Sequence, residues 1–264
     1  MRTKRGESMD KPVIIAFANQ KGGVGKTTSA VNIAASIAAM GHKVLLCDLD
    51  PQGNSTSGVG VNKKSVRYSS YEALLGQCTP DSAVVETKWE NLYLIPSTIN
   101  LVGAEIELLD VEERERRFEK TIKGLTKPFE YVIVDCPPSL GMLTINALTA
   151  SSGVVIPMQC EYYALEGLSQ LMITIKKIKQ IYNKNLYIMG ILITMYNGRL
   201  NLTSQVTAEL KKYYADKLFK TTIARNVKVS EAPSFGEPVI YYDKYSKGSL
   251  AYMDVAKELL ERIY

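Results

Sequence analysis

A short glycine-rich segment contains the residues of this chain that are best suited to chemistry. It reads Gln20-Lys21-Gly22-Gly23-Val24-Gly25-Lys26-Thr27-Thr28 and lies between an apolar, β-rich run and a longer apolar run that predicts a buried helix. Glycines let successive backbone N–H groups point into one concavity, and the first turn of a helix adds its positive end, so the segment is suited to bind phosphate. Lys26 would reach the β- and γ-phosphates of a nucleotide, and the Thr27 hydroxyl would hold Mg²⁺.

Carboxylates follow two other apolar runs. Asp48 and Asp50 come just after residues 44–47, and Asp135 ends the run at residues 131–134. Acids at the carboxyl ends of parallel strands face the ligand crevice of a sheet, and alternation along an extended chain sends Asp48 and Asp50 to the same side. Asp135 is typical of the strand-end acid that holds Mg²⁺ through water in phosphate-loop enzymes. The acids do not suggest a glycosidase, because the features around them are a phosphate loop and a magnesium site.

The elements that must position these residues alternate between strand and helix. Apolar, β-rich runs predict strands at residues 13–18, 44–47, 92–95, 131–134, 154–157 and 187–194, and a short strand at 219–223. Helical patterns predict helices at residues 27–40, 112–120, 165–182, 202–214 and 249–263. Such alternation predicts an α/β fold with a three-layer, doubly wound, mostly parallel sheet. The phosphate loop between the first strand and helix indicates that this sheet is of the P-loop NTPase type. We expect residues 1–11 to be a disordered lead, in which Met9 could be the true start, and residues 12–264 to form a single domain.

Composition narrows the classes of function. The 264 residues include no run of about 18 apolar residues, so we expect no membrane-spanning helix. The four cysteines are scattered, which favours a reducing cytosol, and the single histidine, His42, excludes a histidine-based triad or a multi-histidine metal site. Residues 164–228 carry eleven Lys and Arg but three acids, although the whole chain has a net charge of only +5. This uneven distribution predicts an anionic partner.

Lys21 distinguishes the loop from the general phosphate-loop pattern, because Lys26 already serves the phosphates. The segment resembles the deviant Walker A loop, K-G-G-x-G-K-[ST], of the ParA/MinD superfamily. From Val13 onward the chain resembles ParA/Soj partition ATPases in particular, through residues 48–54, 104–108, 135–140, 159–167, 225–227 and 230–234. The resemblance implies that Lys21 crosses a dimer interface to the partner's nucleotide, so that ATP binding drives two chains into a sandwich homodimer.

The same resemblance implies roles for the residues of a nucleotide site. The catalytic residues would be Lys21, Lys26, Asp50 and Asp48, with Asp50 orienting the attacking water. ATP would be held by Lys21, Gly22, Gly23, Val24, Gly25, Lys26, Thr27 and Thr28, and its adenine by the loop at Ala224 and Asn226. Mg²⁺ would be held by Thr27, Asp135 and Asp48. In the family the adenine loop usually reads Ile-Pro-Arg-Asn, and here Ala224 replaces its proline.

The resemblance further implies a DNA-segregation ATPase with weak basal activity, cytoplasmic and associated with the nucleoid. It would bind double-stranded DNA without sequence preference, because the chain lacks the long N-terminal helix-turn-helix extension of the larger plasmid ParA proteins. The residues that contact DNA would be Arg199 first and then Arg225 and Lys228. Hydrolysis stimulated by a ParB-like centromere-binding protein would release the DNA. The cargo, a chromosome or a plasmid, is left open.

Other classes of protein remain as alternatives. A MinD-like cell-division ATPase would end in an amphipathic membrane helix, whereas residues 249–264 contain three acids and predict a closing core helix, so we expect no membrane partner. An iron–sulfur ATPase would need a cysteine motif that Cys136 and Cys160 lack. A bacterial tyrosine kinase would cluster its tyrosines near the C-terminus, but the 16 tyrosines here are dispersed. A DNA-binding module without catalysis would need neither the phosphate loop nor the strand-end acids.

Overall fold

Seven strands form one sheet in the computed structural model, which describes residues 11–263. Their order is β3-β4-β2-β5-β1-β6-β7, and every neighbouring pair is parallel except β3 and β4. The strands are β1 Val13–Phe17, β2 Val44–Asp48, β3 Val85–Glu86, β4 Leu92–Ile95, β5 Tyr131–Asp135, β6 Gly153–Met158 and β7 Tyr187–Ile193. The chain builds the sheet outward on one side of β1 through β2 and β4, and on the other side through β6 and β7. The strand order thus reverses its direction at β1, and in parallel sheets ligands bind beside such a point, at the carboxyl ends of the strands.

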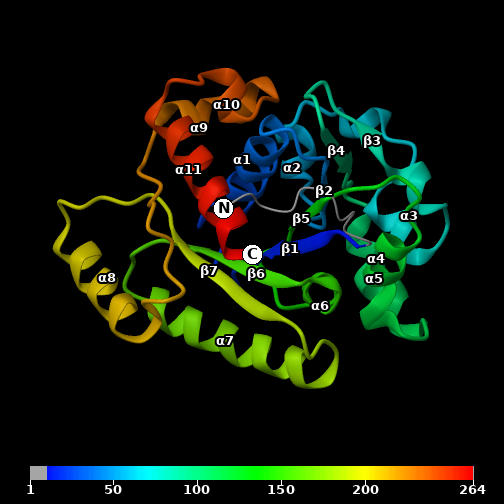
Figure 1. The fold of residues 1–264 in the computed structure, drawn as a ribbon. Coiled ribbons are helices and arrows are strands. Elements are labelled where there is room, and N and C mark those ends of the chain that lie inside the picture. Colours follow the sequence, from blue (N-terminus) through cyan, green and yellow to red (C-terminus); the bar gives the residue numbers. More distant parts are fainter. Residues whose placement is uncertain (1–10, 264) are drawn as a thin grey trace, which may run out of the picture.

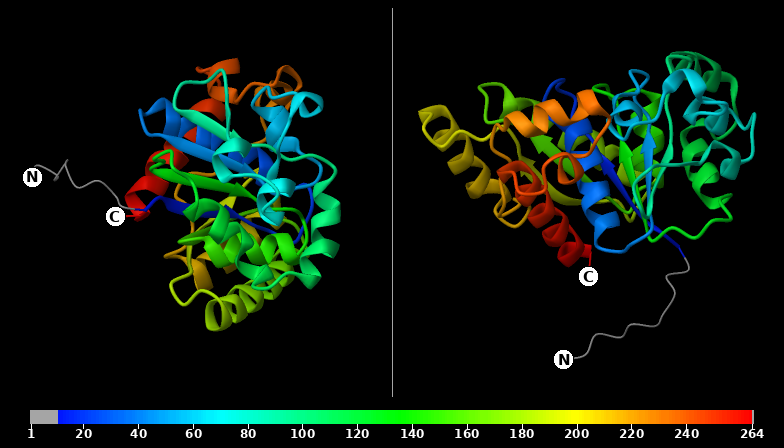
Figure 2. Two further views of the ribbon diagram at one scale, coloured as in Figure 1. Left: turned by 90° about the vertical axis from the view of Figure 1, so that its right-hand side faces the viewer. Right: turned by 90° about the horizontal axis from the view of Figure 1, so that it is seen from above.

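Helices cover both faces of the sheet, as Figures 1 and 2 show. One face is covered by α1 Lys26–Ala39 and α11 Lys247–Ile263, with α9 Val227–Glu231 and α10 Val239–Tyr242 beside them. The other face is covered by α3 Ser70–Leu75, α4 Leu101–Glu107, α5 Arg117–Lys123, α6 Met142–Ala150, α7 Ala164–Ile181 and α8 Asn201–Tyr214. The remaining elements are α2 Asn54–Gly58 and the 3-10 turns η1 Lys63–Ser65, η2 Pro80–Ala83, η3 Leu108–Asp110, η4 Arg114–Arg116 and η5 Ala232–Phe235.

Alternation along the strands produces two apolar cores. In β1, Ile15 and Phe17 belong to the core beneath α1, whereas Ala16 belongs to the core on the α7 side. A strand that is buried on both faces has no polar side, which is why these strands appear in the sequence as continuous apolar runs. α1 is apolar almost all round because it lies between the sheet and α11. The phosphate loop therefore joins two elements that are both fixed by the core.

The sequence correctly predicted the fold class, six strands to within one residue at each end, and the four longest helices to within two. The strand predicted at residues 219–223 is wrong, since the isolated bridges here form only at Leu218 and Ala224, just outside this segment. Phe219 N and Ile223 N do donate to the β7 carbonyls of Ile191 and Ile193, at 3.0 and 2.9 Å. Between them, Lys220 N donates instead to the Glu258 carboxylate of α11, which interrupts the ladder.

The helix predicted at residues 112–120 begins later than expected. Glu113 adopts a left-handed φ of 52°, a conformation that breaks a right-handed helix, and α5 starts only at Arg117 after a 3-10 turn. The disordered lead predicted for residues 1–11 lies outside the described residues apart from Lys11. Within residues 11–263, no helix is both long enough and apolar enough to cross a membrane.

Close packing at Gly190 of β7 provides a test of this fold. A Cβ at Gly190 would overlap the ring of Phe219 and approach Arg262 Nη1 to 2.9 Å. Arg262 Nη1 donates hydrogen bonds to the carbonyl oxygens of Met189 and Lys217 at 2.9 and 3.1 Å, so it is not free to move away. We expect Gly190→Val to lower the free energy of unfolding by about 1–3 kcal/mol, the usual cost of overpacking. Urea unfolding followed by circular dichroism measures this change.

Gly167 of α7 is the matched control, because a Cβ there meets no atom within 4 Å. Gly167→Ala should raise the free energy of unfolding by about 0.5–1 kcal/mol, since alanine is the better helix former. A Gly190→Val protein that unfolds at the same urea concentration as the wild type would contradict the packing described for β7.

Candidate functional site

The phosphate loop lies between β1 and α1 at the carboxyl edge of the sheet. Gly23 and Gly25 have φ values of 73° and 80°, which glycine adopts without strain. Side chains that follow two other strands hold the loop in place. Thr194 Oγ1 donates to Val24 O at 2.8 Å, and Gln159 Nε2 donates to Gly23 O at 2.7 Å. The loop is therefore braced by the residues that follow β6 and β7.

Lys26, the first residue of α1, is buried in this loop. It is only 6% exposed, and its Nζ donates to the carbonyl oxygen of Lys21 at 3.0 Å. Burial lowers the pKa of the Lys26 ammonium, whereas the charges of Asp135 and Asp50 oppose that shift. A buried cation beside converging backbone N–H groups is suited to take up phosphate oxygens.

Asp48 ends β2 and is fully buried. Its Oδ2 accepts hydrogen bonds from Thr56 N at 2.8 Å and Thr56 Oγ1 at 2.7 Å, and its Oδ1 accepts one from Asp50 N at 3.2 Å. Thr56 Oγ1 in turn accepts a hydrogen bond from Ser97 N at 2.9 Å. Burial raises the pKa of Asp48, but the three donors favour its charged form. We therefore assign a negative charge to this carboxylate.

Asp135 ends β5 in register with Asp48 on the neighbouring strand. Its Oδ2 accepts a hydrogen bond from Ser55 Oγ at 2.8 Å, whereas its Oδ1 is buried without a hydrogen-bond partner. Burial, and then the charge of Asp48, raise the pKa of Asp135 to about 8, although the hydroxyls of Thr27 and Ser55 act in the opposite direction. Burial therefore favours the protonated form of Asp135 at neutral pH.

The surroundings of Asp135 fit a magnesium ion. A buried carboxylate oxygen with no hydrogen-bond partner, close to the hydroxyl of Thr27, supplies the oxygen ligands that this hard cation prefers. Across residues 11–263, no group of three His, Cys, Asp or Glu is arranged to hold a metal ion by itself. In nucleotide sites, Mg²⁺ is commonly held by one or two protein groups together with phosphates and water.

Asp50 begins a tight turn two residues after β2 and is 7% exposed. Its Oδ1 accepts a hydrogen bond from Gln52 N at 2.9 Å, and its carbonyl accepts one from Gly53 N at 2.8 Å. Gly53 has a φ of 62°, and a Cβ there would come within 2.9 Å of Ser97 O, so the turn requires glycine. Lys63 Nζ donates to Gln52 O at 2.6 Å from the outside. The Asp50 carboxylate is thus held in one orientation at the mouth of the site.

Lys21 forms an ion pair with Glu161, which follows β6 in the same chain. The two side chains are 40% and 47% exposed, so the pair lies at the rim of the phosphate loop. Asn19 Oδ1 fixes the backbone beneath it by accepting a hydrogen bond from Lys21 N at 3.0 Å. This ion pair holds the Lys21 ammonium against its own chain.

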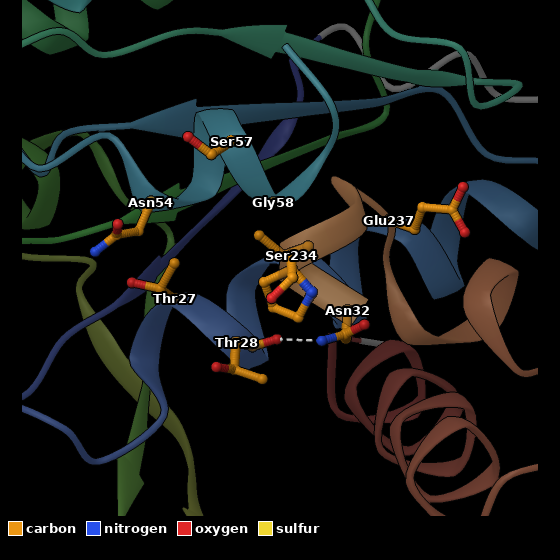
Figure 3. Close-up of a pocket in the computed structure, with 10 residues that line it drawn as sticks. Thr27, Thr28, Asn32, Asn54, Ser57, Gly58, Ser234 and Glu237 are labelled. Carbon is orange, nitrogen blue, oxygen red and sulfur yellow. Dashed lines mark hydrogen bonds between the residues drawn. The ribbon is translucent and has the colours of Figure 1, made fainter. Parts of the chain in front are cut away.

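Two cavities adjoin the phosphate loop. The larger, of about 650 Å³, is lined by residues that include Gly25, Thr28, Thr194, Ala224, Arg225, Asn226 and Ser234. The smaller, of about 410 Å³, lies between α1, α2 and η5, and Figure 3 shows Thr27, Thr28, Asn54, Ser57 and Ser234 around it. Thr28 and Ser234 line both cavities, so the two are adjacent. The larger cavity has the size of a small-molecule site and brings Ala224 and Asn226 beside the phosphate loop.

The three residues predicted to bind DNA lie in different surroundings. Arg199 is exposed in the loop between β7 and α8, and Arg225 is exposed at the edge of the larger cavity. Tyr196 N donates to Ile223 O at 2.9 Å, so the segments that carry these two arginines run side by side. Lys228 instead pairs with Glu231 at 3.2 Å, which raises the pKa of its ammonium and partly neutralises its charge.

Four residues that support the site were not identified from the sequence. Ser55 and Thr56 hold the two buried strand-end acids, and Gln159 and Thr194 hold the phosphate loop. Ser55 and Thr56 follow a glycine-containing turn in a helix of only five residues, which has no periodic pattern to reveal it. Gln159 lies just after the strand predicted at residues 154–157, and Thr194 is the last residue of the strand predicted at 187–194. Their position at strand ends is the only signal in the sequence that could have revealed them.

Comparison with known proteins agrees with this geometry. Residues 12–188, which include the phosphate loop and all three acids, match the family model described as an AAA domain. The chain is 53% identical over 246 residues to the sporulation initiation inhibitor protein Soj of Bacillus subtilis, covering 93% of this chain and 97% of that protein. It is 47% identical over 249 residues to the chromosome partitioning protein ParA of Myxococcus xanthus, covering 94% and 88% of the two chains.

Among solved structures, a cobyrinic acid a,c-diamide synthase of Mycobacterium smegmatis with bound ADP and magnesium is similar at a TM-score of 0.84 and 37% identity. The match covers 96% of this chain and 95% of that one. Identity is higher to the partition proteins, and it extends over nearly the whole of both chains. The protein with this phosphate loop and these buried acids therefore belongs to the ParA/Soj family of chromosome-partitioning ATPases.

Proposed function

We propose that this protein is an ATP-dependent DNA-segregation ATPase that acts as a nucleotide switch. ATP binding would drive two chains into a sandwich homodimer, and the dimer would bind double-stranded DNA without sequence preference. Hydrolysis stimulated by a ParB-like centromere-binding protein would then release the DNA, so the protein would be cytoplasmic and associated with the nucleoid. The observation that carries the proposal is the cluster of Lys26, Asp48, Asp50 and Asp135 beside a braced phosphate loop.

Each part of ATP has a place in this site. The base and ribose would occupy the larger cavity near Ala224 and Asn226, and the phosphates would lie against the loop N–H groups and Lys26. Thr27 and Asp135 would hold Mg²⁺, with Asp48 acting through water. When bound, the ion would neutralise charge on the β- and γ-phosphates. A relative with ADP and magnesium bound supports this assignment.

Asp50 is the residue best placed to orient the attacking water. The hydrogen bond from Gln52 N and the turn closed at Gly53 fix its carboxylate before substrate binds. Lys26 would stabilise the negative charge that builds on the phosphates during the reaction. The basal rate would be weak, because a single chain keeps Lys21 paired with Glu161 and each site needs Lys21 from the partner.

The DNA footprint would consist of Arg199 and Arg225, with a smaller contribution from Lys228. Contacts from exposed cations to phosphates give salt-sensitive binding that does not depend on base sequence. A dimer presents this footprint twice, so ATP would control DNA affinity through avidity. In the alternative, a MinD-like cell-division ATPase, the last helix would anchor to membrane. In this protein the apolar side of α11 is buried in the core with α1, so this helix is not available to bind membrane.

Retention of the protein on DNA tests the proposed function. Wild-type protein should stay on immobilised double-stranded DNA with ATP, and should wash off with ADP or without nucleotide. Arg199→Glu should lose this retention because it repels phosphate, and it should reduce the slope of log affinity against log salt by about one per protomer. Filter binding across a salt series measures both effects, and ATP binding measured in parallel should be unchanged.

Lys43→Glu is the matched control, since this exposed lysine precedes β2 at the opposite edge of the sheet and its replacement changes the net charge by the same amount. The control should retain DNA as the wild type does. Equal retention by Arg199→Glu and the wild type would show that the DNA footprint lies elsewhere.

Variants of Lys21 and Glu161, which form an ion pair in the single chain, test the proposed dimerisation. Lys21→Ala should abolish dimerisation with a non-hydrolysable ATP analogue, because the opposite nucleotide loses its cation. Glu161→Gln should do the reverse, because Lys21 no longer has to leave an ion pair before it crosses to the second chain. An exposed pair is worth about 0.2–1 kcal/mol, so breaking two per dimer should shift the dimerisation midpoint about two- to thirtyfold toward lower protein concentration.

Sedimentation velocity across a concentration series measures both variants. Lys120→Ala, which breaks the exposed ion pair with Glu113 on the α5 side, serves as the control and should leave the midpoint unchanged. A Lys21→Ala protein that still dimerises with the analogue would rule out the proposed contact between chains.

A further inference from the structure

The peptide group between Gln52 and Gly53 is held at both ends. Its N–H, on Gly53, donates to the Asp50 carbonyl oxygen at 2.8 Å, and its carbonyl oxygen, on Gln52, accepts a hydrogen bond from Lys63 Nζ at 2.6 Å. Within residues 11–263 the Lys63 ammonium forms no ion pair with an acid, so this carbonyl is its partner. A cation at one end of a peptide group polarises it and strengthens the N–H donor at the other end. Lys63 therefore stabilises the turn that begins at Asp50.

Glycine at position 53 makes this restraint necessary. With a φ of 62° and no Cβ, Gly53 lets the peptide group before it rotate at little cost. Such a rotation would point the N–H away from the Asp50 carbonyl and open the turn. Lys63 Cδ and Ser97 O each lie 2.9 Å from the place where a Cβ on Gly53 would stand, so both residues pack directly against the glycine. The lysine thus restrains a peptide group that the glycine alone would leave free to turn.

The segment that carries Lys63 is itself fixed to the fold. Lys63 begins η1, and Val59, four residues earlier, is buried in the core beneath α1. Between them, Gly60 has a φ of 85°, and a Cβ on it would come within 2.9 Å of Gly236 O, so the two backbones are in contact. Gly236 follows η5, whose Ser234 lines both cavities. A side chain mounted on such a supported segment can hold its target in one place.

The neighbouring lysine shows that this arrangement is specific to position 63. Lys64 is exposed, and in the described part of the chain its side chain makes no hydrogen bond or ion pair. Lys63 is half-buried, lies across Gly53 and donates to one defined acceptor. Two adjacent residues of the same type therefore differ only in their contact with the turn.

We propose that Lys63 is a positioning residue for ATP hydrolysis, and that it holds the Asp50 carboxylate in the orientation that the attacking water requires. The link between the two residues is Gln52. Lys63 holds the carbonyl of Gln52, and the N–H of Gln52 donates to Asp50 Oδ1 at 2.9 Å. This inference rests on the proposed function, because it takes Asp50 to orient the attacking water.

Steady-state hydrolysis by the full-length protein across a series of ATP concentrations tests this role. Lys63→Met removes the ammonium but keeps a side chain of similar length. It should lower kcat by about tenfold, since misplacing a reacting group by about 1 Å can cost a hundredfold. KM and the Kd for a non-hydrolysable ATP analogue should not change, because the lysine acts on the turn and not on the nucleotide. Lys63→Arg keeps a cationic donor and should recover most of kcat.

Lys64→Met is the matched control, because it removes the same charge from the next position, and it should hydrolyse ATP as the wild type does. A merely structural role for Lys63 would weaken analogue binding together with kcat and would contradict the proposal. So would a Lys63→Met protein with the kcat of the wild type, an equal loss in Lys64→Met, or a Lys63→Arg protein that is as slow as Lys63→Met.

Asp50→Ala, assayed in parallel, separates this inference from the proposed function. It should lose hydrolysis and still bind the analogue. If Asp50→Ala is slow while Lys63→Met is not, only the role of Lys63 fails. If Asp50→Ala hydrolyses ATP at the rate of the wild type, the proposed role of Asp50 fails, whatever the rate of Lys63→Met.

Discussion

The structure depends on the burial of three acidic side chains and one ammonium at a single edge of the sheet. Asp48 and Asp135 are fully buried, and Asp50 and Lys26 are nearly so. Removing such charges from water costs several kcal/mol per ion unless they find partners, and like charges on adjacent strands add to that cost. Thr56 and the Asp50 N–H stabilise Asp48, whereas Asp135 keeps one oxygen without a partner. Acids with strongly shifted pKa values cluster at functional sites. A ligand that brings Mg²⁺ and phosphate would supply the partner that the Asp135 carboxyl oxygen lacks.

The fold brings these groups together by placing β1, β2 and β5 side by side, so that the phosphate loop, Asp48 and Asp135 end at one edge. The five residues of α2 and the turn before them then join the acids of the proposed nucleotide site. Ser55 contacts Asp135, Thr56 contacts Asp48, and the turn that begins α2 holds Asp50. Through Ser97, Thr56 also reaches the segment that leads into α4. Hydrogen bonds therefore connect Asp48 to the turn at Asp50 and, through Thr56 and Ser97, to the segment that precedes α4.

Much of this arrangement was predictable because it rests on local patterns. Buried strands appear as apolar runs, the loop appears as glycines before Lys26 and Thr27, and acids at strand ends indicate the ligand edge. What escaped prediction depends on contacts between distant residues. The pairing of Lys21 with Glu161 joins positions 140 residues apart. Glu258 takes the N–H of Lys220 and prevents the strand expected at residues 219–223. The exposure of Ile106 cannot be read from a helix of seven residues that also buries Leu101 and Ala104.

The most direct test of the central claim counts the protons released when Mg²⁺ and ADP bind. Titration calorimetry in two buffers of different ionisation enthalpy, at about pH 7, gives this number. A carboxyl group whose pKa is raised to about 8 is mostly protonated at that pH and must lose its proton to hold the ion. The account predicts that the wild-type protein releases up to about one proton more than Asp135→Asn, which has no proton to give. Equal proton release by the two proteins would contradict it.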